Sequence, residues 1–220
     1  MRGRAFTLVE LLVTIAIIAV LAALVFPASR AAAAAKAKNR GRAELRQVES
    51  YIEVYKGSLN YYPPSSGLTD PTFNPLYYEL AGTQLSNGVY ITLDSRFKLN
   101  AVDVSIAFRL SGFANSLAGQ GSDDNRQPQN FFKGSLRTGQ YLEIPVTNRV
   151  LKTSTRVVVL GSLVEGSAML PGASGGSINP FGYNSASPTN NPTSYDLWLD
   201  IIAGGKKVRL CNWSDKPIKL

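Results

Sequence analysis

Apolar residues concentrate in one run near the start of this chain. Residues 11–28 carry no charged side chain, and counting from Phe6 gives about 20 predominantly apolar residues, enough to cross roughly 30 Å of hydrocarbon as a helix. One carboxylate, Glu10, lies at the head of this run. Pro27, near its end, predicts a helix kink or a locally melted turn. The alanine-rich residues 31–38 then favour helix again.

The next segment, residues 42–56, is predicted to be an amphipathic helix. Apolar side chains recur three or four residues apart, and charged side chains occupy the opposite positions. The apolar positions are Leu45, Val48, Ile52 and Tyr55, and the charged positions are Arg46, Glu49, Glu53 and Lys56. This apolar stripe requires a surface to pack against, which the remaining residues must supply.

Beyond Gly57 the pattern changes to short β-prone runs separated by Gly, Asn, Ser and Pro. The strand candidates are residues 89–93, 102–108, 141–144, 156–160, 194–202 and 207–211. Within 102–108, apolar residues alternate with others, which predicts one apolar face of a strand. We therefore predict an α+β fold, in which a long N-terminal helix packs through its amphipathic half on a mainly antiparallel β-sheet head.

Three further segments of the head are assigned from composition. A short helix is expected around residues 74–82. The segments 119–128 and 170–192 are rich in Gly, Pro and polar residues and are expected to be surface loops. Trp198 and Trp213 are expected to be core or sheet-face aromatics rather than ligand platforms.

Composition and charge exclude several classes of function. The chain has a formal net charge of +8, no His and a single Cys, Cys211. Without His, the commonest general base and every Ser–His or Cys–His nucleophile pair are missing, so we predict that the protein is not an enzyme. A lone cysteine cannot form an intramolecular disulfide. Residues 172–176 lack the Lys-Ser/Thr of a phosphate loop, and no zinc-finger or helix-turn-helix pattern predicts nucleic-acid binding.

The basic residues crowd the stretch just past the apolar run. They are Arg30, Lys36, Lys38, Arg40 and Arg42. Beside a membrane segment, such a cluster is typical of contacts to anionic lipid headgroups or to neighbouring subunits.

The first ten residues read Met-Arg-Gly-Arg-Ala and then Phe-Thr-Leu-Val-Glu. In a secretory signal peptide the cut site follows the apolar run, whereas here the short basic leader precedes it. The arrangement from this leader through Pro27 resembles that of the prepilin family, the type IV pilins and the pseudopilins of type II secretion, and the layout beyond it is most similar to the major pseudopilin. One position departs from the family pattern, because Ala5 stands where the family usually has Gly.

The resemblance implies how the protein is processed and divided. A prepilin peptidase/methyltransferase would cleave between Ala5 and Phe6 and methylate the new amine of Phe6. The chain would then comprise a leader (1–5), a transmembrane or filament-core helix (6–28), the amphipathic half of the stem (29–56) and a head (57–220). Glu10 would pair with the Phe6 amine of an adjacent subunit. The alternative is that Glu10 lies close enough to the lipid headgroups to stay solvated.

The implied function is that of a structural subunit of a type II secretion pseudopilus. The protein would sit in the bacterial inner membrane, leader in the cytoplasm and head outside, and polymerise with other pseudopilins on an inner-membrane assembly platform. The positive-inside rule alone favours the opposite orientation, but long C-terminal domains translocate despite flanking charge. A type IV pilus subunit for adhesion, motility or DNA uptake is one alternative. A membrane-anchored binding module or enzyme is a more remote one.

No cofactor is expected, with calcium as the one candidate. Calcium takes several carboxylate and carbonyl oxygens, and the acidic groupings are Asp123 with Asp124 and Asp196 with Asp200. Major pseudopilins commonly hold calcium in a C-terminal loop, but their acidic, Gly-rich pattern is not reproduced here. We interpret the first pair as part of a solvated loop and the second as outward-facing strand residues.

Overall fold

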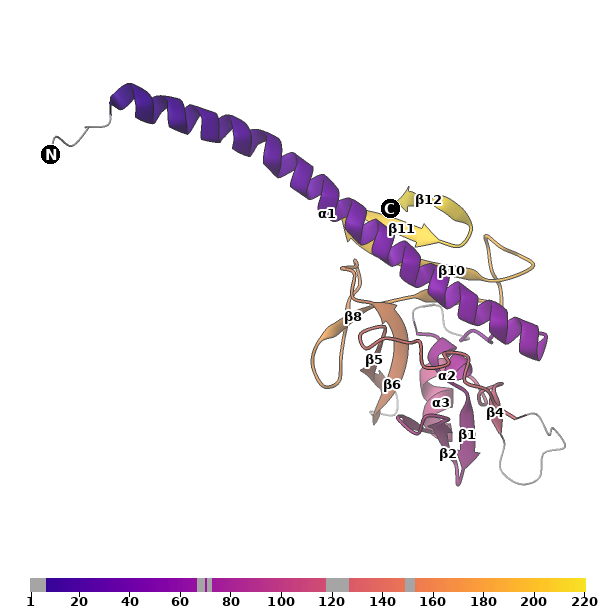
Figure 1. Cartoon of the computed structure of the whole chain (residues 1–220). Helices are drawn as coiled ribbons and strands as arrows, with labels where there is room; N and C mark the ends of the chain where they lie inside the picture. Colours follow the sequence, from indigo (N-terminus) through magenta and orange to yellow (C-terminus); the bar gives the residue numbers. More distant parts are fainter. Residues whose placement is uncertain (1–6, 67–69, 71–72, 118–126, 149–152) are drawn as a thin grey trace.

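The computed structural model describes residues 7–66, 70, 73–117, 127–148 and 153–220. The stem is one continuous helix, α1 (Leu8–Leu59). Figure 1 shows its N-terminal half extending away from the head and its C-terminal half lying along it. The helix passes through position 27 without interruption, so the locally melted turn is not present, and the ribbon is gently curved instead. It ends at Asn60, whose left-handed backbone (φ 66°) closes the last turn.

The C-terminal half of α1 packs on the head through the predicted stripe. Leu45, Val48, Ile52 and Tyr55 are all buried, which confirms this prediction. The strands that α1 contacts most are β10 (Asp196–Ala203) and β11 (Lys206–Cys211). The helix approaches the sheet so closely at Gly41 that a Cβ atom there would lie 2.8 Å from Cδ1 of Leu210. Burial of this stripe is what fixes the stem to the head.

The described strands form three four-stranded sheets. The first has the order β3-β2-β1-β4, from β1 (Thr83–Ser86), β2 (Val89–Thr92), β3 (Lys98–Asn100) and β4 (Ser116–Leu117). The second, β5-β6-β8-β7, is built from β5 (Tyr141–Asn148), β6 (Thr153–Ser162), β7 (Leu170–Pro171) and β8 (Ser177–Pro180). The third, β12-β11-β10-β9, adds β9 (Gly182–Asn184) and β12 (Ser214–Lys219) to the two strands under α1.

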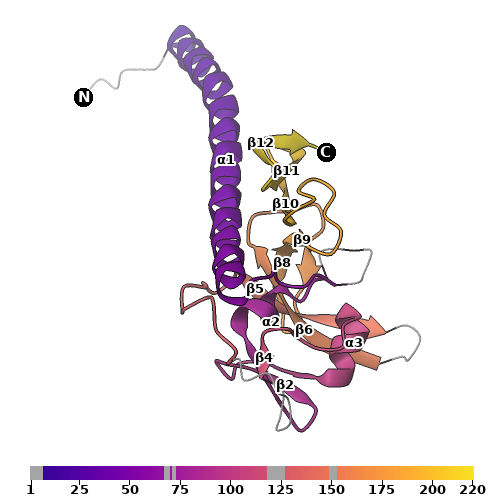
Figure 2. The ribbon, with the colours of Figure 1, turned by 90° about the vertical axis from the view of Figure 1, so that its right-hand side faces the viewer.

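The sheets stack along the stem rather than around it. Figure 2 shows β10, β11 and β12 beside the middle of α1, β8 at the level of its C-terminal turns, and β2 and β4 beyond its end. Strand pairing is antiparallel throughout the described ladders except between β1 and β4, which run parallel. The architecture is thus α+β, with a long N-terminal helix on a mainly antiparallel head, as the sequence predicts.

Most of the predicted head elements are present. Strands occur as expected near 89–93, 141–144, 156–160, 194–202 and 207–211, as β2, β5, β6, β10 and β11. The short helix expected around 74–82 is α2 (Leu76–Ala81). Trp198 lies on β10 and Trp213 in the turn from β11 to β12, and their rings pack edge to face on this sheet with centroids 6.1 Å apart. The prediction that they are sheet-face aromatics is therefore confirmed.

The strand predicted at 102–108 is wrong, because these residues form a helix, α3 (Ala101–Phe108). Val104, Ala107 and Phe108 are buried, at helical spacing, while Val102 is 68% exposed. Asn100 adopts the extended backbone of an N-cap and donates its side-chain amide to Asp103 (3.1 Å). Asn100 makes no side-chain cap hydrogen bond, so burial of one helical face is what favours helix over the alternating pattern.

The prediction that 170–192 is a surface loop is also wrong in part. This segment contains β7, β8 and β9, and Ile178, Phe181 and Tyr183 are buried in it. The chain at Gly182 passes so close to Trp198 that a Cβ atom would lie 2.1 Å from the indole ring. These three buried apolar residues hold the segment in the head, where β8 pairs with β6 and β9 pairs with β10. Of the other predicted loop, 119–128, all but the last two residues lie outside the described residues.

Candidate functional site

The stem begins with a capping box that involves Glu10. The Thr7 hydroxyl accepts a hydrogen bond from the Glu10 backbone N–H (3.2 Å), and Oε2 of Glu10 accepts from the Thr7 backbone N–H (2.8 Å). The Thr7 hydroxyl also donates to Oε2 (2.7 Å). Two backbone donors that a helix start leaves unpaired are thereby satisfied. Glu10 thus has a local partner in the single chain, a role that the sequence reasoning did not include.

The apolar face of the stem has no partner within the described chain. In its most apolar 18-residue window the mean hydropathy is 2.9, and none of that window is buried. Leu8, Ile18 and Phe26 are each exposed over more than 60% of their surface. An exposed apolar surface of this length marks a membrane or protein contact. Length and composition make α1 a candidate membrane span.

The basic residues just past the span have different environments. Arg42 binds the head, donating to the backbone oxygens of Cys211 (2.6 Å) and Asp215 (3.1 Å). Arg40 pairs with Glu44 one turn along the helix (2.8 Å). Arg30, Lys36 and Arg40 line a pocket between α1 and the head. The cluster therefore includes one residue that anchors the stem and three that face a cavity.

A buried carboxyl group, which the sequence analysis missed, joins the end of the stem to the head. Glu79 lies on α2 and is fully buried. Its Oε2 accepts hydrogen bonds from the Tyr55 hydroxyl (3.0 Å) and the Asn115 backbone N–H (2.9 Å), and Oε1 accepts from the Ala114 N–H (2.8 Å). Burial raises the pKa of Glu79 to about 7, although these hydrogen bonds oppose the shift. The only sequence signal was one acidic residue in an otherwise apolar or aromatic six-residue helix.

Asp196 and Asp200 are the candidate calcium ligands within the described residues, and the prediction that both face outward is wrong for Asp196, which is buried. Asp196 accepts hydrogen bonds from the backbone N–H groups of Thr189 (2.8 Å), Asn190 (3.0 Å) and Asn191 (2.9 Å). Asp200 is held in a two-bond ion pair by Arg209, at 2.7 Å for each bond. Both carboxylates therefore face donors, whereas calcium requires converging oxygens. Asp123 and Asp124 lie outside the described residues, within which no cluster of three potential metal ligands occurs.

The remaining predicted site residues are placed as follows. Ala5 and Phe6, the expected cleavage and methylation positions, lie outside the described residues. Cys211 is a free, buried cysteine on β11. Residues 172–176 form the turn between β7 and β8, closed by a hydrogen bond from the Gly172 N–H to the Gly176 carbonyl (3.0 Å). The features that bear on function, the capping box and the exposed apolar helix, therefore lie on the N-terminal stem.

Comparison with known proteins identifies the same region. Residues 1–26 match the family described as "Prokaryotic N-terminal methylation motif". Neither the curated proteins nor the solved structures give a match to the chain. The match covers the leader, the capping box at Glu10 and nearly all of the apolar run.

Proposed function

Because the chain carries the prepilin-type N-terminal cleavage and methylation motif of the type IV pilin and pseudopilin family, we propose that it is a structural subunit of a type II secretion pseudopilus. The motif and the long apolar helix fit a pilin-like subunit anchored in the inner membrane. The proposed role is assembly: stems bundle in the core of a helical filament, and heads coat it. Pilin-like proteins are generally structural rather than catalytic, which agrees with the absence of His.

The observation that carries this proposal is the unburied apolar stem headed by a single carboxylate. A bilayer covers the apolar surface of the stem before assembly, and neighbouring stems cover it in a filament. Glu10 is then costly in lipid, where a carboxylate near the centre of a span costs at least about 2.5 kcal/mol on insertion scales and less toward the interface. Pairing with the Phe6 amine of an adjacent subunit would replace the local capping contacts and favour assembly.

We further propose the processing and topology that go with this role. A prepilin peptidase removes residues 1–5 and methylates Phe6, leaving 6–28 as the membrane or filament-core helix. Residues 29–56 are the amphipathic half of the stem, and residues 57–220 are the head, which lies outside the inner membrane. An inner-membrane assembly platform and other pseudopilins are the proposed partners.

The alternative is a subunit of a type IV pilus used for adhesion, motility or DNA uptake. Cys211 is the single cysteine of the sequence, so the chain lacks the C-terminal cysteine pair that would favour a type IV pilin. This favours the pseudopilin. Deleting the gene and measuring protein secretion, twitching motility and DNA uptake separates the two. Loss of secretion alone supports the pseudopilin, and loss of motility or DNA uptake with secretion intact supports the pilus.

The proposed pairing of Glu10 is tested by two substitutions. Glu10→Gln retains a capping-box side chain but removes the charge, whereas Glu10→Val removes both. If Glu10 pairs with an amine, both variants insert into the membrane as well as the parent, yet neither yields filaments on shearing. Thr14→Val, which alters a polar group one turn further along the same exposed segment, is the control and should assemble.

The outcome with Glu10→Gln distinguishes the two roles of the carboxylate. Normal amounts of sheared filament from this variant would show that capping the helix is sufficient and that no charge pair is needed. Normal amounts from Glu10→Val would contradict both roles. Membrane fractionation of each variant checks that failure to assemble does not reflect failure to insert.

A further inference from the structure

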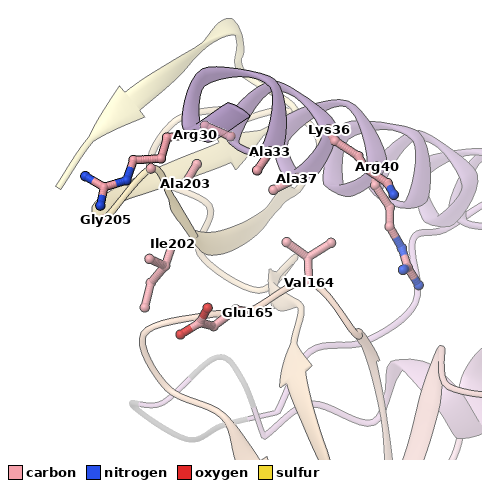
Figure 3. A pocket seen from close by; sticks show the side chains of 12 residues that line it. Arg30, Ala33, Lys36, Ala37, Arg40, Val164, Glu165, Ile202, Ala203 and Gly205 are labelled. Atoms are coloured by element: carbon pink, nitrogen blue, oxygen red, sulfur yellow. The ribbon is translucent and has the colours of Figure 1, made fainter. Parts of the chain in front are cut away.

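A pocket of about 620 Å³ lies where the stem leaves the membrane-proximal end of the head. Figure 3 shows Ala33 and Ala37 of α1 on one side of it and Val164 and Ile202 on the other. Its volume falls within the range of roughly 300–1,000 Å³ that is usual for small-ligand sites. The pocket therefore has apolar walls and sufficient size to hold part of a small amphiphile.

The wall opposite the helix is held in place by backbone pairing. The Ile202 N–H donates to the Glu165 carbonyl oxygen (2.8 Å), and Gly166 forms a bridge with Ile201 of β10. The turn between β10 and β11 closes the pocket at Gly204, where a Cβ atom would lie 3.4 Å from that of Ala34. The cavity is thus formed between two elements that are already packed on each other.

The charged residues of the lining are mostly cationic. Arg30, Lys36 and Arg40 come from α1, and Glu165 is the one acidic residue, so the described lining carries a net charge of +2. Arg30 lies at one end and Arg40 at the other in Figure 3. Arg40 also forms an ion pair with Glu44. Arg30 and Lys36 are exposed, and no ion pair is found for either among the described residues. The pocket is suited to an anionic group.

The position of the pocket along the helix limits what can reach it. With a rise of about 1.5 Å per residue, Arg30 lies roughly 3 Å and Lys36 roughly 12 Å along the axis beyond Ala28, where the uncharged run ends. The polar headgroup layer adds roughly 5–8 Å on each side of the hydrocarbon core. With the stem embedded to Ala28, the Arg30 end of the pocket is at headgroup level, and tilt of the helix brings Lys36 closer to it.

We propose that this pocket binds the headgroup of an anionic phospholipid from the leaflet next to the head, an inference that rests on the proposed membrane embedding of the stem. Arg30, at the bilayer end of the pocket, contacts the phosphate through charge-assisted hydrogen bonds, and Lys36 adds positive charge further along the helix. The headgroup beyond the phosphate lies between Ala33 and Ala37 on one side and Val164 and Ile202 on the other. The Glu165 carboxylate accepts a hydrogen bond from a headgroup hydroxyl. The lipid orients the unassembled subunit by joining stem, head and bilayer surface.

The test uses the full processed chain, purified in a non-ionic detergent and titrated with either phosphatidylglycerol or phosphatidylcholine. Native mass spectrometry counts the lipids retained per chain. We expect one retained phosphatidylglycerol, bound at least about tenfold more tightly than phosphatidylcholine. Arg30→Gln with Lys36→Gln should remove this preference, since each basic residue near an anionic surface contributes about fivefold. Lys98→Gln with Lys133→Gln is the matched control, because it removes two exposed charges elsewhere on the head.

A second variant separates the pocket from the general basic charge. Ala33→Leu fills the cavity from an exposed helix position and leaves every charge in place. We expect it to lose the phosphatidylglycerol preference as the double-charge variant does, with an unchanged melting temperature of the head. Undiminished binding by Ala33→Leu would overturn the pocket in favour of a diffuse charged surface. Equal loss in the Lys98 and Lys133 control, or no preference in the parent, would also overturn it.

Two further outcomes keep this inference separate from the proposed function. A dimer mass in place of a lipid adduct, lost in Ala33→Leu, would show that a second copy occupies the pocket, which would refute the lipid assignment. Lipid retention is measured on single chains and filament formation on sheared cells. A chain that assembles normally but shows no lipid preference overturns only the pocket, whereas one that binds the lipid but never assembles overturns the proposed function.

Discussion

Replacing Glu79 by glutamine is expected to abolish most of the pH dependence of the head's stability between about pH 4.5 and pH 7. Glu79 is fully buried, and burial raises its pKa to about 7 from a usual value near 4.5. In that window the folded protein keeps a proton on Glu79 that the unfolded chain releases. Stability is therefore complete below the lower value and falls as the pH rises toward the higher one.

The size of this effect follows from the shift. A difference of about 2.5 pKa units corresponds to about 3 kcal/mol of unfolding free energy. For a protein of this size, that change moves the melting temperature by roughly 6–12 °C. Glutamine stays neutral across the window, so its curve should be flat. Glutamine also replaces one of the two carboxyl oxygens, which can accept even when the group is protonated, with an NH2 that only donates, and this lowers stability at about pH 5 by roughly 1–3 kcal/mol.

The assay is thermal unfolding of the full chain in a non-ionic detergent, followed by circular dichroism at several pH values. Glu165→Gln, at an exposed carboxylate, is the control and should retain the parent's slope. The parent should lose stability from about pH 5 to about pH 8, while Glu79→Gln should not, so the two curves converge at the alkaline end. Parallel curves for the parent and Glu79→Gln would refute the reasoning, because the titrating group would then lie elsewhere.

Three further changes have expected outcomes on the same melting assay. Ile52→Asp places an unpaired carboxylate in the stem–head interface and should lower stability by several kcal/mol. Val54→Asp, at an exposed position, should change stability little. Equal melting midpoints for the two variants would mean that the stem does not pack on the head. Asp196→Asn replaces one of the two acceptor oxygens with an NH2 donor that faces backbone N–H groups and should lower stability by about 1–3 kcal/mol. A calcium chelator should leave the parent unchanged, and a chelator-induced drop would mean that this carboxylate binds a cation. Gly182→Ala forces a methyl group against Trp198 and should cost about 1–3 kcal/mol; an unchanged midpoint would show that the two strands can separate freely.

The stem could be predicted from sequence because its signals are local and redundant. An uncharged run long enough for a bilayer, then Leu45, Val48 and Ile52 at helical spacing, leaves few alternative structures. The structure follows both patterns, and the capping box at Thr7 and Glu10 adds a local reason for the carboxylate. The capping box was itself legible as Thr followed by Glu three residues later.

Parts of the head could not be predicted because the competing signals were close in strength. Alternating Val and Ile at 102–108 suggested a strand, yet tertiary burial of Val104 and Phe108 favours the helix. The carboxyl of Glu79 has partners 24 to 36 residues away in the chain. Asp196 is satisfied by backbone donors of its own loop. Neither set of contacts leaves a periodic trace in the sequence.

The identity of the mature N-terminus decides whether the chain is processed as a prepilin. The protein is extracted from membranes of cells that contain a prepilin peptidase, and its intact mass and N-terminal sequence are determined. The account predicts a chain that begins at Phe6, lacks residues 1–5 and carries a methyl group on the new amine. A chain that still begins with the leader, or one whose terminus lies beyond Ala28, would contradict it.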